Sequence, residues 1–203
     1  SELSDDLLQM VAYCARVSNP GNQINEATSE KLVKYLIKHQ HWSPLEMVSA
    51  CLEIDTTRDI GRQLLRHRSF SFQEFSQRYA DPTKDMSFIR RGARLQDPKN
   101  RQNSIDAAPQ VVQDLWDIKQ QEVINKAREV YEWAIKEGIA KEQARSVLPE
   151  GNTMSRLYVN GTLRSWIHYI QLRAENGTQQ EHMDIAKTVG KVIYEIFPLD
   201  DII

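Results

Sequence analysis

The chain has 203 residues, of which 27% are charged and 40% are apolar. This balance is ordinary for a folded globular protein and argues against disorder, and the length predicts a single domain over residues 1–203. The net charge of −2 provides no long-range positive field to attract nucleic acid or an anionic membrane surface. We therefore expect no nucleic-acid partner, and any recognition of anions must be local.

Export and thiol chemistry are also disfavoured. No run of eighteen apolar residues occurs, and residues 1–10 lack the basic and apolar parts of a signal peptide, so we expect a cytoplasmic protein with no membrane partner. Cys14 and Cys51 could pair, but a reducing compartment favours free thiols. Without a CxxC or HExxH motif, we expect no metal site.

The first third of the chain predicts two helices. Apolar residues at helical spacing predict a helix over 5–16, which "NPGN" at 19–22 brings to an end. Ser29 is expected to cap a second helix, and Ser43-Pro44 to stop it.

A strand and a short helix should follow. Apolar residues alternate from Val48 to Ile54, which is typical of a strand with one buried face. Thr57 is expected to cap a short helix that leads into "RHRSFSFQEFSQRY" at 66–79. An extended conformation over 70–79 would place Glu74, Ser76 and Arg78 on one side.

The second half predicts mainly helices. A polar loop over 81–108 is expected to contain a short strand at 86–90. Pro109 should open a long helix that Gly138 closes. The expected inner face of that helix consists of Val112, Leu115, Lys119, Val123, Val130 and Ala134. Three further helices are expected over 140–147, 162–173 and 181–197.

Two segments concentrate side chains that can bind a nucleotide. In the first, at 66–79, arginines can grip phosphate and Glu74 can accept from ribose hydroxyls or ring N–H groups. In the second, Arg164 and His168 stand one helical turn apart, with apolar residues packing elsewhere. Each residue taken alone also fits a plain structural role, because basic last turns are common. His67 could titrate, contact a ring or be a satisfied surface imidazole.

Taken in order, five segments resemble the flavin-dependent thymidylate synthases. The family signature is RHR, seven residues and then Ser, which here runs from Arg66 to Ser76. The other matching segments are "CARVS" at 14–18, "KHQHWSPLE" at 38–46, "ARSVLP" at 144–149 and "LRAENGTQQE" at 172–181.

The resemblance implies an α+β fold with a twisted, mainly antiparallel sheet flanked by helices. It implies a homotetramer with shared active sites that methylates dUMP to dTMP. FAD would be the cofactor, with NADPH as reductant and methylenetetrahydrofolate as one-carbon donor. Reduced flavin would deliver the hydride without a cysteine nucleophile, and neither cysteine has an evident base in the sequence.

The resemblance also assigns residues. Those matching positions near FAD are Ser18, Ser43, Arg66, His67, Arg68, Glu74, Arg164 and His168. Those matching positions around dUMP are Gln63, Glu74, Ser76, Arg78, Arg145 and Arg173. For catalysis, Arg173 could polarise the pyrimidine carbonyl, Ser76 could polarise or position the substrate, and His41 matches a position linked to activity or to folate. A flavin-contacting Asn is not clearly placed among residues 160–162.

Two other classes remain open on sequence alone. A nucleic-acid-binding module could use Arg66–Arg68 and Arg90-Arg91 against phosphates, although the overall acidity argues against it. A helical scaffold without a ligand is the third possibility.

Overall fold

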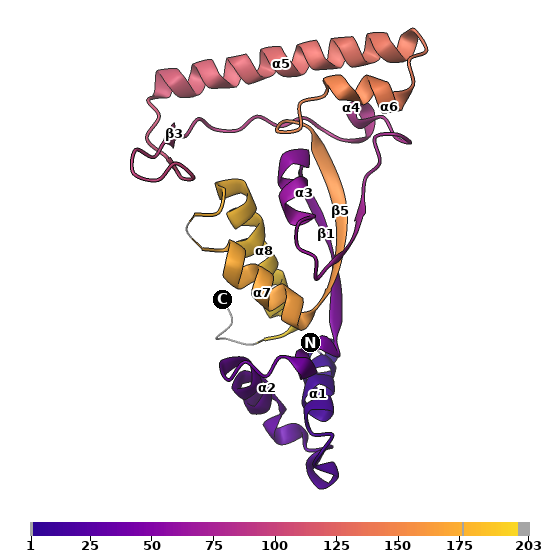
Figure 1. Ribbon diagram of the computed structural model, residues 1–203, viewed down its shortest axis with the longest axis vertical. Helices are drawn as coiled ribbons and strands as arrows, with labels where there is room; N and C mark the ends of the chain where they lie inside the picture. Colours follow the sequence, from indigo (N-terminus) through magenta and orange to yellow (C-terminus); the bar gives the residue numbers. More distant parts are fainter. Residues whose placement is uncertain (1, 176, 199–203) are drawn as a thin grey trace. The chain divides into compact units, whose positions relative to one another are not determined.

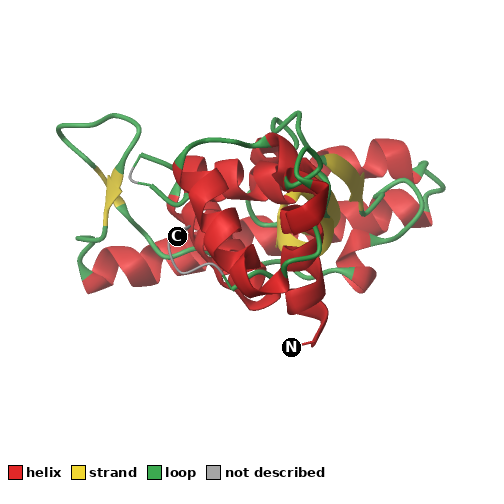
Figure 2. Cartoon of the chain, turned by 90° about the horizontal axis from the view of Figure 1, so that it is seen from below, coloured by secondary structure: helices red, strands yellow, loops and turns green. Residues whose placement is uncertain are grey.

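The computed structural model describes residues 2–175 and 177–198, with side chains described from residue 7 onward. The chain divides into two compact units, which are described in turn. Unit 1 comprises Ser1–Leu52, His67–Ser71 and Asn160–Ile203, and unit 2 comprises Glu53–Arg66 and Phe72–Val159. Helices and strands are both present (Figure 2), as expected for an α+β protein.

Unit 1 is mainly helical. Its helices pack in two groups, α1 against α2 and α7 against α8, and the short helix η3 contacts both α1 and α7 (Figure 1). The bounds are α1 Glu2–Ala15, η1 Pro20–Asn22, η2 Glu26–Thr28, α2 Ser29–Lys38, η3 Ser43–Glu46, α7 Leu163–Arg173 and α8 Gln180–Ile196. Its core includes the fully buried Val11, Val33, Leu45 and Ile167.

Unit 2 is built on the sheet and on the long helix α5. Strands β1, β5 and β2 form a three-stranded sheet in the order β1-β5-β2. Each of these strands has some of its residues in unit 1 and the others in unit 2. The strand bounds are β1 Ser49–Thr57, β2 Ser71–Glu74, β3 Leu95–Gln96, β4 Ser104–Ile105 and β5 Met154–Thr162. β3 and β4 pair antiparallel as a separate hairpin.

The helices of unit 2 are α3 Arg58–Leu64, α4 Pro82–Asp85, α5 Gln110–Lys136, α6 Lys141–Ala144 and η4 Arg145–Val147. The C-terminal half of α5 packs against α6 and η4 (Figure 1), around a cluster that contains Tyr131, Ala134, Ala144 and Leu148. Gly138, at a φ of +79°, reverses the chain after α5, a conformation that glycine adopts without a steric penalty.

The expected helix starts are confirmed in part. α2 begins at Ser29, but Ser29 is its first residue and its hydroxyl donates to the Asn25 carbonyl at 3.3 Å, so the predicted capping role is wrong. Thr57 does stand at the N-cap position of α3. Its hydroxyl donates to the Asp59 carboxylate at 2.5 Å instead of capping a backbone N–H.

The extended segment predicted over 70–79 is wrong beyond Glu74, where β2 ends. The backbone N–H groups of Tyr79 and Ala80 both donate to the Ser76 carbonyl, each at 3.1 Å. This turn prevents Glu74, Ser76 and Arg78 from following one another along one face of a strand.

The strand predicted at 86–90 is reduced to one antiparallel bridge between Phe88 and Thr153. The hairpin of β3 and β4, helix α4 and strand β5 had not been predicted. β5 matters most, because it is the middle strand of the sheet.

The predicted inner face of α5 is confirmed at Ala134 but is wrong in the N-terminal part of the helix. Val112, Leu115 and Val123 are 39%, 53% and 52% exposed, whereas the buried residues of α5 are Gln120, Ile124, Ala127, Tyr131 and Ala134. Apolar residues occur on both sides of this helix, so periodicity alone did not identify the buried side. Among the described helices, none combines the length and the hydropathy needed to cross a bilayer.

Candidate functional site

The predicted site residues occur in both units. Unit 1 contains Ser18, His41, Ser43, His67, Arg68, Arg164, His168 and Arg173. Unit 2 contains Gln63, Arg66, Glu74, Ser76, Arg78 and Arg145.

In unit 1, the structure joins two predicted residues from distant segments. Arg173, at the end of α7, donates through Nε to Nε2 of His67 at 3.0 Å. A ring nitrogen that accepts a hydrogen bond carries no proton, so His67 is neutral in this arrangement and its proton resides on Nδ1. Burial and the positive charge of Arg173 both lower the pKa of His67, which favours the same state.

Aromatic side chains surround this pair. The His67 ring lies 5.1 Å from the Tyr169 ring and 6.2 Å from the His182 ring, with both contacts close to perpendicular. Tyr169 and His182 are 2% and 0% exposed. Burial, helped by the positive charge of Arg173, lowers the pKa of His182 to about 4, and burial raises the pKa of Tyr169.

The predicted polar strip of α7 contacts η3 and the residue before it. Arg164 forms an ion pair with Glu46, and the His168 ring lies 4.4 Å from the Trp42 ring. Burial and the charge of Arg164 lower the pKa of His168. Because Ser43 belongs to the same short helix as Glu46, three residues assigned to FAD gather at one place in unit 1.

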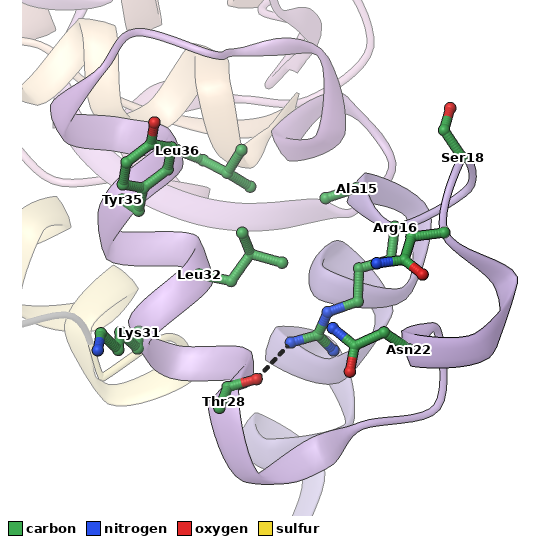
Figure 3. A pocket seen from close by; sticks show the side chains of 10 residues that line it. Ala15, Arg16, Ser18, Asn22, Thr28, Lys31, Leu32, Tyr35 and Leu36 are labelled. Atoms are coloured by element: carbon green, nitrogen blue, oxygen red, sulfur yellow. Dashed lines mark hydrogen bonds between the residues drawn. The ribbon is translucent and has the colours of Figure 1, made fainter.

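Ser18 lies at one end of a pocket of about 510 Å³ between α1 and α2 (Figure 3). The buried Arg16 crosses this pocket and donates to the Thr28 hydroxyl at 2.8 Å. Lys31 adds a second cation, while Leu32 and Leu36 supply the apolar lining. No described hydrogen bond links Ser18 to another predicted site residue.

His41, Arg66 and Arg68 are among the predicted residues that are exposed. His41 contacts the Tyr35 ring at 6.1 Å. Arg66, in unit 2, and Arg68, in unit 1, form no side-chain hydrogen bond or ion pair within the described part of the chain. Both guanidinium groups are therefore available to an external anion.

In unit 2, Glu74 is held by partners that the sequence did not reveal. Its Oε1 accepts from Arg58 Nη1 at 3.1 Å and from the Ser155 hydroxyl at 3.0 Å. Arg58 is 6% exposed, and burial lowers its pKa. The Glu74 carboxylate is thus fixed in direction, with the more exposed Arg62 3.9 Å away.

Two other dUMP candidates of unit 2, Arg78 and Arg145, contact Glu142. Arg78 pairs with the Glu142 carboxylate at 3.6 Å, and Arg145 donates to the Glu142 carbonyl at 3.4 Å. The backbone N–H of Arg78 donates to the Ser76 hydroxyl at 3.4 Å. The turn after β2 and the end of α6 therefore bring a hydroxyl and two guanidinium groups together.

These groups fit anion recognition. Guanidinium groups bind phosphates, and the aromatic and amphipathic surface of Trp42 and His168 suits a flat ring system, so the donors present are compatible with a nucleotide cofactor such as FAD. Within residues 7–175 and 177–198, no group of three or more His, Cys, Asp or Glu side chains is placed to hold a metal ion. Cys14 and Cys51 are free thiols.

The family is established by comparison with known proteins. The family model described as "Thymidylate synthase complementing protein" matches residues 2–199. A probable flavin-dependent thymidylate synthase of Paramecium bursaria Chlorella virus 1 is 48% identical over 190 residues, which cover 94% of this chain and 87% of that relative. The chain belongs to the flavin-dependent thymidylate synthase family.

Two further comparisons agree with this family. A flavin-dependent thymidylate synthase of Synechocystis sp. is 48% identical over 189 residues, covering 93% of this chain and 85% of the relative. The crystal structure of a UMP/dUMP methylase from Streptomyces cacaoi, bound with 5-Br dUMP, matches with a TM-score of 0.81 and 25% identity over 95% of this chain and 87% of that one. The expected α+β class and the expected enzyme family are confirmed.

Several contacts of this chain were missed from sequence. Trp42 lies inside the matching segment 38–46 and directly precedes Ser43, so the sequence could have indicated Trp42 as a site residue. Tyr169, His182 and Arg58 gave no comparable signal, because their partners are distant in the sequence, and the same holds for the contact of the Glu142 carboxylate with Arg78.

Proposed function

We propose that this chain catalyses the reductive methylation of dUMP to dTMP, with FAD as cofactor, methylenetetrahydrofolate as one-carbon donor and NADPH as reductant. The observation that carries the proposal is that Arg78 and Arg145 both contact Glu142 while the Arg78 backbone N–H donates to the Ser76 hydroxyl, since this brings together a hydroxyl and two guanidinium groups, a donor set that suits a nucleotide phosphate. Family membership and the dUMP methylase of similar structure support the same substrate.

The residues on the dUMP side have distinct roles. Arg78 and Arg145 bind the phosphate, which requires Arg78 to exchange the Glu142 carboxylate for a phosphate oxygen. Ser76 positions the substrate by hydrogen bonding. Arg173 donates to the pyrimidine carbonyl and stabilises negative charge that develops on the ring.

Glu74 and Gln63 complete the dUMP side. Arg58 and Ser155 hold the Glu74 carboxylate, which accepts from a ribose hydroxyl or a ring N–H group. Gln63, on α3, can supply both a donor and an acceptor.

The residues that would hold FAD are Ser18, Ser43, Arg66, His67, Arg68, Glu74, Arg164 and His168. When bound, FAD would supply the hydride that completes the methyl group. Arg66 and Arg68 form no side-chain hydrogen bond or ion pair with the described residues, and their guanidinium groups are suited to a diphosphate. The exposed His41 faces solvent in this chain and is assigned to the folate side.

No cysteine nucleophile takes part in this scheme. Cys14 lies in α1 and Cys51 in β1, and neither thiol has a hydrogen-bonding partner or an ion pair within the described residues. A thiol needs a neighbouring base or cation to become a strong nucleophile at neutral pH. Within the described residues the Ser76 hydroxyl accepts from the backbone N–H of Arg78 and is not hydrogen-bonded to a base, which supports a positioning role.

We further propose a cytoplasmic homotetramer in which active sites are shared between subunits, each chain acting as one functional domain. The family match supports one domain because it runs through both units.

The decisive experiment measures tritium release from dUMP labelled at C5, together with an absorbance spectrum between about 350 and 500 nm. Release is expected only when FAD, NADPH and methylenetetrahydrofolate are all present, and the purified protein should be yellow. Omission of each component in turn is the control. A protein that binds no FAD, or that releases no tritium with all components present, contradicts the proposal.

A further inference from the structure

Behind the contact between His67 and Arg173 lies a buried polar pair, Tyr169 and His182, which the proposed chemistry does not use. Tyr169 comes from α7 and His182 from α8, and their rings lie 5.7 Å apart. Each also contacts the His67 ring almost at a right angle, at 5.1 Å and 6.2 Å. His67 thus rests on two rings from two helices.

Filling space does not require these residue types. Phe and Leu would occupy similar volumes without carrying polar atoms into the core, and a buried hydroxyl without a partner is unfavourable. The Tyr169 hydroxyl is buried and has no hydrogen-bond partner within the described residues. The polar groups are placed beside the imidazole that accepts a hydrogen bond from Arg173.

The charges around His67 explain what the buried pair of Tyr169 and His182 can do. The titratable groups that face it are Arg173 and Tyr169 from α7 and His182 from α8. At neutral pH both Tyr169 and His182 are uncharged, because burial raises the pKa of Tyr169 and lowers that of His182 to about 4. Arg173 is then the only charge of the group, and His67 can remain an acceptor.

We propose that Tyr169 and His182 are positioning residues, which fix the orientation and the neutral Nδ1–H tautomer of His67 so that Arg173 is held for the substrate. Perpendicular ring contacts from two helices restrict rotation of the imidazole. With Nε2 directed at Arg173, the arginine is bonded through Nε, and its two terminal nitrogens remain to act on a ligand. This inference rests on the proposed assignment of His67 and Arg173 to the active site.

The first test uses ¹⁵N NMR of the histidine rings in the full-length protein. Wild-type His67 should show one neutral tautomer, with an unprotonated Nε2, and its signals can be assigned with a His67→Ala variant. In Tyr169→Leu and His182→Leu the ring should sample both tautomers, because each change removes one of the two perpendicular ring contacts. Tyr131→Leu is the matched control, because it removes another fully buried tyrosine ring, located in unit 2.

The second test is a double-mutant cycle on tritium release. His182→Leu should lower turnover by about tenfold, and the neutral polar His182→Gln should recover most of it. If His182 acts through His67, the loss caused by His182→Leu should shrink below about twofold in the His67→Ala background.

Three results would overturn the inference. The first is a single His67 tautomer in both the Tyr169 and the His182 variant. The others are a loss of turnover by His182→Leu that is undiminished in the His67→Ala background, and equal turnover in His182→Leu and His182→Gln. Lack of tritium release by the wild type would instead refute the proposed function. The ¹⁵N NMR spectra would still decide whether Tyr169 and His182 position His67.

Discussion

At the scale of single residues, the candidate site is distinguished by which cations already have partners. Arg78 is paired with Glu142 at 3.6 Å, but both side chains are more than half exposed. An exposed pair of this kind contributes little to stability, so a phosphate can displace the carboxylate at small cost. Arg66 and Arg68 need no such exchange.

Replacing Arg78 with alanine should therefore weaken dUMP binding selectively. Loss of a hydrogen bond to a charged phosphate costs about 1.5–3 kcal/mol, so the Kd for dUMP should rise roughly ten- to hundredfold while FAD stays bound. Calorimetric titration measures the first quantity and flavin absorbance the second. Arg90→Ala is the control, since Arg90 is also in unit 2 and pairs with Asp117 at 3.0 Å. Equal loss of both ligands would show that the division of the site is wrong.

His182 should make stability depend on pH. Its pKa is about 4 in the folded chain and about 6.5 when unfolded, so below pH 6.5 the unfolded state binds the additional proton. The stabilisation is thus complete above pH 6.5 and is lost as the pH falls toward 4, by about 3 kcal/mol in total. Urea unfolding at several pH values should show this loss, and His182→Leu should reduce it. Replacing the exposed His39 with glutamine is the control and should leave the dependence of stability on pH as in the wild type. An unchanged dependence in His182→Leu would disprove its assignment to His182.

The sequence named candidate site residues, but it did not reveal which residues contact them. The motifs supplied His67 and Arg173, and the structure joins them directly, although 106 residues separate them. Nothing in the sequence pairs Arg78 with Glu142 or places His182 against His67, because such contacts follow from how elements pack.

At the scale of elements, strongly periodic helices were predicted well and the central strand was missed. β5 alternates buried and less buried positions, but its buried set includes Ser155 and Gly161 besides Leu157 and Val159. An alternation carried by serine and glycine gives no apolar signal. In α5 the opposite occurs, because apolar residues on two faces give two competing signals.

Gly161, near the end of β5, is required by close packing. A Cβ built there would lie 2.3 Å from Cδ1 of Phe70, which itself packs on Trp166 at 4.5 Å. Gly161→Ala should therefore destabilise the protein by about 1–3 kcal/mol, measured by chemical unfolding. Gly21→Ala is the matched control, since nothing lies within 4 Å of a Cβ at that position. A Gly161→Ala protein as stable as Gly21→Ala would mean that Phe70 has room to move.

At the scale of the whole molecule, the exposed side of α5 is unusual for a surface. Val111, Leu115 and Ile118 are 63%, 53% and 52% exposed and follow one another at helical spacing, with Trp116 beside them at 46%. Contiguous apolar surface of this kind commonly marks an interface between proteins. A homotetramer would supply the covering surface from other copies of the chain.

The tetramer proposal can be tested on this helix. Light scattering should give a mass four times the chain's 23.5 kDa, and Leu115→Lys should shift it toward smaller species, because burying an unpaired ammonium group in an apolar contact is unfavourable. Glu122→Lys, a charge change at an exposed position of the same helix, should leave the mass unchanged. If active sites are shared between subunits, Leu115→Lys should also lose tritium release in proportion to dissociation, while its circular dichroism stays that of the wild type. A monomeric wild type, or a tetrameric and active Leu115→Lys, would show that α5 does not hold the subunits together.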